Sequence, residues 1–173
     1  MSLGILHYPS PVLSIASKPV ELVDFEFLKE LEEKCTKDKV FGIAAPQVGV
    51  SQRIFVALIE GSYKVFVNPY VLKSSEILDV AEEACLSLPG ISFLVERPLD
   101  ILVSYAEPDF STRELKSVNR KLFKMDARVF MHECDHLNGQ TILDKLGPVK
   151  KDLYLRKYLK FKKHHKDVIS RMR

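Results

Sequence analysis

The stretch "DARVFMHECDHLNG", Asp126 to Gly139, predicts a helix that carries two histidines four positions apart. Asp126 can cap its start, no helix breaker interrupts it, and the Asn138-Gly139 pair can end it. Positions four apart on an α-helix differ by about 40° around the axis, so His132 and His136 can direct their ring nitrogens at one metal ion. The spacing H-E-x-x-H therefore predicts a metal-binding helix.

The three residues between these histidines lie at other angles around the helix axis. Cys134 lies about 200° from His132, nearly opposite the histidine pair, so it cannot share their metal and is expected to be a buried thiol. Glu133 and Asp135 flank the midline of the pair by about 80° on either side. Either carboxylate can act as a base or as the partner of a ligand, and the spacing does not choose between them.

A catalytic site of this kind usually has three protein ligands and an open position for water. Metalloproteases with this helix take the third ligand downstream, but here Ile142 stands at the last position of the longer histidine motif and no glutamate follows Glu133. His164 and His165 belong to a basic segment and are expected to face solvent. The best upstream candidate is Cys85 in "EEACLSLPG", because a thiolate with two imidazoles suits iron(II) or zinc.

Length and composition are those of an ordinary globular protein. The 173 residues suit one domain, and the 46% of apolar residues include no run near the ~20 that a bilayer span requires. The start, "MSLGILHYPSPVLSIASKPV", has no basic leader, so we expect neither a signal peptide nor a transit peptide. Three widely spaced cysteines without a CxxC pair argue against a disulfide framework and favour a reducing cytoplasm.

Charge is distributed unevenly along the chain. Residues 150–173 carry ten Lys or Arg against two Asp, a net charge of +8, whereas the total of +3 leaves −5 for residues 1–149. Leu155, Tyr158 and Leu159 form an amphipathic stripe among these lysines, which indicates a helix.

Patterns upstream of the central helix predict a second helix and several strands. "DFEFLKELEEKC" begins with Asp24 as a cap and predicts a helix from about Asp24 to Thr36, with Cys35 in the core. "RIFVALI", "KVFVNPY" and "DILVSYA" are rich in β-branched and aromatic residues and predict strands of a largely antiparallel sheet. A further strand is expected within "EILDVAEEA", so the fold class is α+β.

Three motifs carry a family resemblance: "GIAAPQ" at Gly42 to Gln47, "EACLS" at Glu83 to Ser87, and "HECDH" at His132 to His136. In order and spacing they resemble the signature motifs of peptide deformylases, G-x-G-x-A-A-x-Q, E-G-C-L-S and H-E-x-D-H. The resemblance runs from "ILHYPSPVL" to "TILDKLGP" and covers most of the chain. It implies an α+β fold in which largely antiparallel sheets pack around the central metal-binding helix.

The resemblance also implies roles for single residues. The implied metal ligands are Cys85, His132 and His136. Glu133 is the implied general acid/base, and Gln47 with the backbone N–H of Leu86 is implied to bind the oxyanion. The implied metal is iron(II), with zinc, nickel or cobalt able to occupy the same site. The implied activity is hydrolysis that releases formate from the formyl-methionine of newly synthesised polypeptides.

A formyl-methionine substrate implies a pocket for an unbranched thioether side chain. Three residues near the motifs are expected to bind it: Gly42, Ile43 and Val129. Met125 is a further candidate for this pocket. Arg97, in "VERP", resembles an arginine common in the family and can pair with Glu83 or Asp135.

Three positions depart from the family motifs: Val40 and Ala84 stand where glycines are usual, and Met131 stands where a glutamine is common. Valine is β-branched and disfavours positive φ. If the family glycine uses that freedom, the loop at Val40 must differ.

The family resemblance also suggests partners. We expect residues 1–149 to form the deformylase catalytic part and residues 150–173 a basic C-terminal helix or tail of the same domain. Its charge can attract it to ribosomal RNA, so ribosome contact is one hypothesis, and a solvated helix packed on the domain is the other. Neither a membrane nor DNA is an expected partner.

Two other functions stay open on sequence grounds. A metalloprotease would share the helix and the hydrolytic water, although the absent downstream ligand speaks against it. A nucleic-acid binder without enzymatic activity would account for the basic segment, but it leaves Gln47, Cys85 and Glu133 without a purpose.

Overall fold

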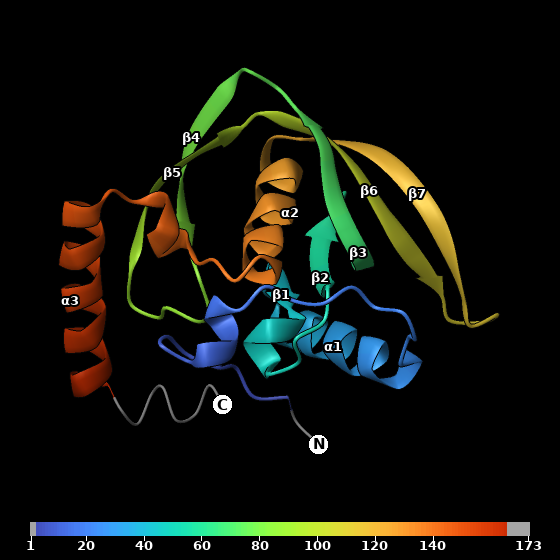
Figure 1. Ribbon diagram of the computed structural model, residues 1–173, viewed down its shortest axis with the longest axis horizontal. Helices are drawn as coiled ribbons and strands as arrows, with labels where there is room; N and C mark the ends of the chain where they lie inside the picture. The colour runs from blue at the N-terminus through green and yellow to red at the C-terminus, as the bar shows by residue number, and fades with distance from the viewer. Residues whose placement is uncertain (1–2, 166–173) are drawn as a thin grey trace.

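Helix α2 (Lys124–Leu137), which carries HECDH, stands at the centre of the molecule between two antiparallel sheets (Figure 1). The computed structural model describes residues 3–165. A five-stranded sheet lies on one side of α2 and a two-stranded sheet on the other (Figure 1). The predicted α+β fold, with antiparallel sheets around this helix, is confirmed. None of the described helices is long and apolar enough to cross a membrane.

The five-stranded sheet has the order β1-β2-β3-β6-β7, and each pair of neighbours is antiparallel. Its strands are β1 (Gly42–Ala44), β2 (Ile54–Ile59), β3 (Ser62–Ser74), β6 (Asp100–Asp109) and β7 (Glu114–Phe123). Successive side chains of β2 alternate between two cores: Phe55 and Ala57 pack with α2, whereas Ile54 and Val56 pack with helix α1 (Phe25–Asp38). The two helices therefore cover opposite faces of this sheet.

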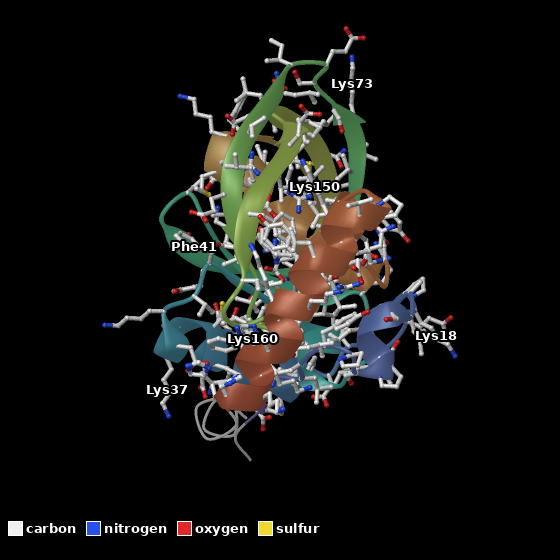
Figure 2. The ribbon with its side chains drawn as sticks, turned by 90° about the vertical axis from the view of Figure 1, so that its left-hand side faces the viewer. Lys18, Lys37, Phe41, Lys73, Lys150 and Lys160 are labelled. Carbon is white, nitrogen blue, oxygen red and sulfur yellow. The ribbon has the colours of Figure 1, made fainter. Side chains whose placement is uncertain are left out.

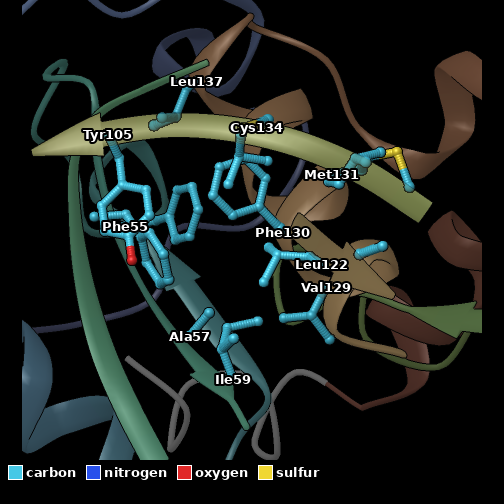
Figure 3. Close-up of a cluster of buried hydrophobic side chains, with 14 of the residues drawn as sticks. Phe55, Ala57, Ile59, Tyr105, Leu122, Val129, Phe130, Met131, Cys134 and Leu137 are labelled. Atoms are coloured by element: carbon cyan, nitrogen blue, oxygen red, sulfur yellow. The ribbon is translucent and has the colours of Figure 1, made fainter. Parts of the chain in front are cut away.

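Aromatic rings dominate the core between α2 and the five-stranded sheet (Figure 3). The rings of Phe55 and Phe66 stack with centroids 4.7 Å apart, and Phe130 of α2 meets them edge-on at 5.1 and 5.3 Å. Such offset and edge-to-face pairs add about 0.5–1.5 kcal/mol each beyond the burial of their area. This cluster fixes the rotation of α2 about its axis. It therefore decides the direction in which His132 and His136 point.

The two-stranded sheet consists of β4 (Leu78–Ala84) and β5 (Ser92–Pro98), paired so that Glu83 lies opposite Phe93. Burial alternates along β4, where Glu83 is buried and both of its neighbours are exposed. Because side chains two apart on a strand share a face, Glu83 and Cys85 both lie on the side that faces α2.

Three short 3-10 helices complete the described elements: η1 (Pro11–Ser14), η2 (Ala45–Val48) and η3 (Ile142–Lys145). Helix η2 follows β1 directly and carries Gln47.

Helix α3 (Pro148–His164) packs beside the two-stranded sheet (Figure 1). Tyr158 is fully buried, its hydroxyl donates a hydrogen bond to the carbonyl of Tyr8 at 2.8 Å, and Tyr154 lies against Phe93 with ring centroids 4.7 Å apart. The predicted helix is confirmed. Leu159 is 48% exposed, however, so the apolar stripe of the helix is narrower than expected. Residues 166–173 of the basic segment lie outside the described residues.

The predicted helices α1 and α2 are each present with one boundary shifted by two residues: α1 ends at Asp38, where about Thr36 was expected, and α2 begins earlier than expected. Asp24 caps α1 by accepting hydrogen bonds from the backbone N–H groups of Glu26 and Phe27, as expected, and Cys35 is buried. Helix α2 begins at Lys124, so the prediction that it starts at Asp126 was wrong. The Asp126 carboxylate instead accepts a hydrogen bond from the N–H of Glu60 in the β2–β3 turn at 3.3 Å.

The four predicted strands are present as β2, β3, β6 and β4, but three others were not expected. Strand β7 lies at the edge of its sheet and most of its side chains are exposed, so its sequence is polar and lacks a strand signal. Strand β1 has only three residues, which is too short for periodicity to be read. Buried and exposed residues alternate along β5, as a strand requires. The strand was not recognised because it follows a Pro-Gly turn within an irregular stretch.

We expect Tyr158→Phe to lower the free energy of unfolding by about 1 kcal/mol, because the hydroxyl loses its bond to the Tyr8 carbonyl while the ring stays packed. For a chain of this size that corresponds to a fall in Tm of about 2–4 °C, measured by thermal unfolding followed by circular dichroism. Leu159→Ala, at an exposed position of the same helix, is the control and should change Tm less. Equal Tm values for Tyr158→Phe and the parent would contradict this assignment.

Candidate metal centre

The structure brings together the three side chains that were predicted to bind a metal. One ligand atom from each of Cys85, His132 and His136 lies within 4.8 Å of the others, and the Cys85 sulfur is 3.2 Å from Nε2 of His136. Cys134 lies on the other face of α2, buried in the aromatic core (Figure 3). Cys134 therefore lies apart from the three grouped side chains, on the face where the helical spacing predicts it.

His132 is oriented by a buried carboxylate. Its Nδ1 lies 2.9 Å from Oε2 of Glu83, so that Nδ1–H donates to the carboxylate and Nε2 faces the group of ligand atoms. Burial alone would raise the pKa of Glu83, but hydrogen bonds from Arg97 and His132 outweigh burial and hold it well below its usual range. Glu83 is therefore charged at neutral pH.

Arg97 pairs with two acids at once, Glu83 and Asp135. It donates to both oxygens of Glu83, at 2.6 and 2.8 Å, and its NH1 lies 3.0 Å from Oδ2 of Asp135. Both expected partners of Arg97 are thus engaged at once. Lys145 contacts the second oxygen of Asp135 at 2.8 Å, so this carboxylate is held by two cations.

Glu133, by contrast, is buried and makes no ion pair with a lysine or arginine within residues 3–165. Its Oε2 has no hydrogen-bond partner among the described residues. Burial raises its pKa to about 7, against the opposing effect of His132 and His136. A Cβ placed on Gly42 would lie 2.7 Å from the carboxyl carbon of Glu133, so only glycine leaves room for this side chain.

The electrostatics of the Cys85 thiol fit a metal ligand. Burial alone would raise its pKa, but the imidazoles of His136 and His132 outweigh burial and lower it to about 5. Cys85 is therefore a thiolate at neutral pH, beside two ring nitrogens, and this donor set suits a divalent metal of intermediate softness.

Gln47 is held in a fixed orientation at the same place. Only 2% of it is exposed, and its Oε1 accepts a hydrogen bond from the Ala44 N–H at 2.9 Å. This bond turns Nε2 toward the cysteine loop, where it lies 3.2 Å from Ser87 Oγ and 3.8 Å from the Cys85 sulfur. Leu86, whose backbone N–H follows Cys85, lies in the same loop.

A cavity of about 720 Å³ opens onto these groups. Its lining includes Gly42, Gln47, Leu86, Met125, Val129 and Glu133. Ile43 is not among the lining residues, because its side chain is buried in the core beneath α1. Of the expected substrate-binding residues, the structure therefore brings Gly42 and Val129 to the cavity, and not the Ile43 side chain.

The departures from the family motifs are accommodated without strain. Val40 lines the cavity and does not adopt positive φ, whereas Lys39 before it does, with φ of 53° as the C-cap of α1. Ala84 also lines the cavity, at the end of β4, and Met131 is buried in the core on α2.

Two features of the site were missed from the sequence: the contact of Glu83 with His132, and the whole role of Arg128. Arg128 donates to Oε1 of Glu83 at 2.7 Å. The signals were present, since Glu83 near the end of a strand precedes Cys85 by two positions and Arg128 precedes His132 by four on a helix.

A buried thiolate, two helical imidazoles and a free carboxylate beside a cavity are typical of a metal-dependent hydrolase. Residues 2–152 match the family model described as "Polypeptide deformylase". A peptide deformylase of Thermotoga maritima is 41% identical over 155 residues, which are 88% of this chain and 91% of the relative.

Solved structures agree with this match. A peptide deformylase of Legionella pneumophila superimposes with a TM-score of 0.82 at 33% identity, covering 92% of this chain and 94% of its own. One from Ehrlichia chaffeensis, in complex with actinonin, gives a TM-score of 0.82 at 32% identity, covering 95% and 99%. The chain belongs to the polypeptide deformylase family. The enzyme is therefore a metal-dependent hydrolase that removes the N-formyl group from newly synthesised polypeptides.

We expect Gly42→Ala to lower kcat for deformylation on the order of 100-fold, because the added methyl group displaces the Glu133 carboxylate. Bound metal, measured by elemental analysis, should be unchanged, since none of the three candidate ligands moves. Gly147→Ala is the matched control, because a Cβ there meets nothing within 4 Å and its φ is −64°. Activity of Gly42→Ala equal to that of the control would contradict the steric role of this glycine.

Proposed function

We propose that Cys85, His132 and His136 bind one divalent ion, and that this ion is iron(II), with zinc, nickel or cobalt able to occupy the same site. The donor set of one thiolate and two imidazoles supports the proposal, as does the separation of the three ligand atoms, which is at most 4.8 Å. When bound, such an ion supplies Lewis-acid activation of water and of the formyl group.

Glu133 is the general acid/base of the reaction in this proposal. It accepts a proton from the attacking water and donates it to the amine nitrogen as the C–N bond breaks. The support is its buried carboxylate without a partner at Oε2 and its pKa, which burial raises to about 7. A group that titrates near neutral pH can both accept and return a proton.

Gln47 and the backbone N–H of Leu86 bind the formyl oxygen as negative charge develops on it. The amide of Gln47 is turned by the Ala44 N–H so that Nε2 points toward the loop of Cys85. A donor that is held in place before the reaction costs no reorganisation, and one such donor is worth about 3 kcal/mol of transition-state stabilisation.

The cavity accepts the methionine side chain and the start of the peptide. Gly42 and Val129 line it, with the half-exposed Met125 at the same cavity. Ile43 takes no part in this proposal, because its side chain is part of the core and it does not line the cavity. The apolar, flexible Met125 suits an unbranched thioether partner.

Enzyme prepared without oxygen and loaded with iron(II) should release formate from a formyl-methionyl peptide. Glu133→Ala should lower kcat by a factor of about 10² to 10⁴ while the bound metal is retained, because Glu133 is not a ligand. Cys85→Ser should lose metal, whereas Cys134→Ser should retain it.

Each part of this experiment has an outcome that would overturn it. No formate from the metal-loaded parent would defeat the activity. Loss of metal in Cys134→Ser with retention in Cys85→Ser would defeat the ligand set. Elemental analysis of enzyme purified from cells without added metal identifies the ion, and a metal other than iron would replace iron(II) in the proposal.

We further propose that residues 1–149 are the catalytic part and residues 150–173 a C-terminal extension of the same domain. Tyr158 is buried and its hydroxyl bonds to the Tyr8 carbonyl, which supports a single domain that includes the C-terminal extension. The proposed compartment is the cytoplasm, where formylated chains are made. Three free cysteines, Cys35, Cys85 and Cys134, are consistent with a reducing compartment.

Helix α3 is the proposed contact with the ribosome. Tyr154, Leu155 and Tyr158 pack against the domain, while lysines including Lys150 and Lys160 lie on the exposed side of the helix (Figure 2). This leaves a basic surface free to meet the phosphates of ribosomal RNA.

Replacing Lys157, Lys160 and Lys163 by glutamate should abolish co-sedimentation with ribosomes at low salt, because the helix then repels phosphate. The control makes the same change at three exposed lysines elsewhere, Lys29, Lys37 and Lys73. The control and the α3 variant then have the same net charge. Equal loss in both variants would show a nonspecific charge effect, and equal retention would remove the ribosome from the proposal.

A further inference from the structure

Arg128 is a buried arginine whose side chain lines the cavity, although it contributes no group to the proposed reaction. Only 4% of it is exposed. It lies four residues before His132 on α2, so both side chains lie on the same face of the helix. Val129 and Met125 of the same helix also line this cavity.

The guanidinium of Arg128 is held by four hydrogen bonds. NH1 donates to Oε1 of Glu83 at 2.7 Å and to the carbonyl of Val95 at 2.9 Å. NH2 donates to the carbonyl of Asp79 at 2.8 Å and to its carboxylate at 3.1 Å. A single side chain of α2 therefore binds both strands of the two-stranded sheet.

These contacts determine how Glu83 is held behind His132. Oε1 of Glu83 accepts from Arg97 at 2.6 Å and from Arg128 at 2.7 Å. Oε2 accepts from Arg97 at 2.8 Å and contacts Nδ1 of His132 at 2.9 Å. Arg97 also pairs with Asp135. Arg128 bonds to the carbonyls of Asp79 and Val95 as well as to Glu83, so it anchors Glu83 to the backbone of β4 and β5.

We propose that Arg128 is a positioning residue for the metal centre, which acts through Glu83 to hold the His132 ring in its ligand orientation. The inference rests on the proposed ligand set. Without the guanidinium, Oε1 of Glu83 keeps one charged donor instead of two, and the carboxylate loses its link to the Asp79 and Val95 carbonyls, so it can move together with the side chain of Arg97, which Asp135 also attracts. Nδ1 of His132 then loses its fixed acceptor, and Nε2 its fixed direction.

A purely structural role for Arg128 predicts a different result. The guanidinium also ties α2 to the two-stranded sheet, so its removal lowers stability under either view. Only the positioning role predicts weaker metal binding by the folded protein. Metal affinity therefore separates the two roles, whereas thermal stability does not.

The experiment is a titration of metal-free protein with Co²⁺, followed by the thiolate-to-cobalt charge-transfer absorption. Arg128→Met keeps the length of the stem that lines the cavity and removes the four hydrogen bonds. We expect it to raise the Kd for Co²⁺ by about 10- to 100-fold, the usual cost of losing a partner that orients a ligand. Arg128→Lys, which restores a charge beside Glu83, should recover part of this loss and gives a second variant if Arg128→Met does not fold.

The matched control is Arg120→Met on β7, which breaks the pair of Arg120 with Glu60 in the β2–β3 turn; neither residue lines the cavity. It should bind Co²⁺ like the parent. A Kd for folded Arg128→Met within twofold of the parent would overturn the positioning role, even if its Tm fell. A parent protein that binds Co²⁺ without a thiolate absorption band would instead overturn the proposed ligand set, and this inference with it.

Discussion

The structure depends on one buried carboxylate, that of Glu83. Taking a carboxylate out of water costs several kcal/mol, and this cost is offset only when its oxygens are fully paired. Here both oxygens are paired, by Arg97, Arg128 and His132. These three partners come from β5 and α2, whereas Glu83 lies on β4. The pairing therefore joins the two-stranded sheet to the central helix, and in doing so sets Cys85 against the two histidines.

Two periodicities meet at this site. On the strand, alternate residues share a face, so Glu83 and Cys85 point the same way. On the helix, residues four apart share a face, so the same is true of Arg128, His132 and His136. Each set alone supplies half of the proposed metal centre: the strand side gives Cys85 and the partner of His132, and the helix gives the two histidines and a partner of Glu83. The aromatic core around Phe130 sets the rotation of α2 at which the two halves face one another.

Much of the site could be predicted because its residues obey local rules or match family motifs. Helical spacing alone predicts that Cys134 faces away from the two histidines, and the missing downstream ligand points to Cys85 upstream. The same spacing left Glu133 and Asp135 equivalent, and the family motif then assigned Glu133 the catalytic role. The structure distinguishes them physically, because Arg97 and Lys145 hold Asp135, whereas Glu133 makes no ion pair with a lysine or arginine of the described part of the chain. Ile43 was expected at the cavity, yet alternation along β1 turns its side chain into the core.

The sequence by itself determined the helix with its two histidines, the thiolate upstream, most of the strands and the basic C-terminal helix, because these are properties of short segments with a regular period. Tertiary structure alone decided the polar β7 edge, the start of α2 at Lys124 and the double role of Arg97. It also decided that Arg128 is an anchor rather than a surface charge. Each of these depends on contacts between segments that are far apart in the chain. Such contacts produce no helical or strand periodicity in the sequence from which they could be predicted.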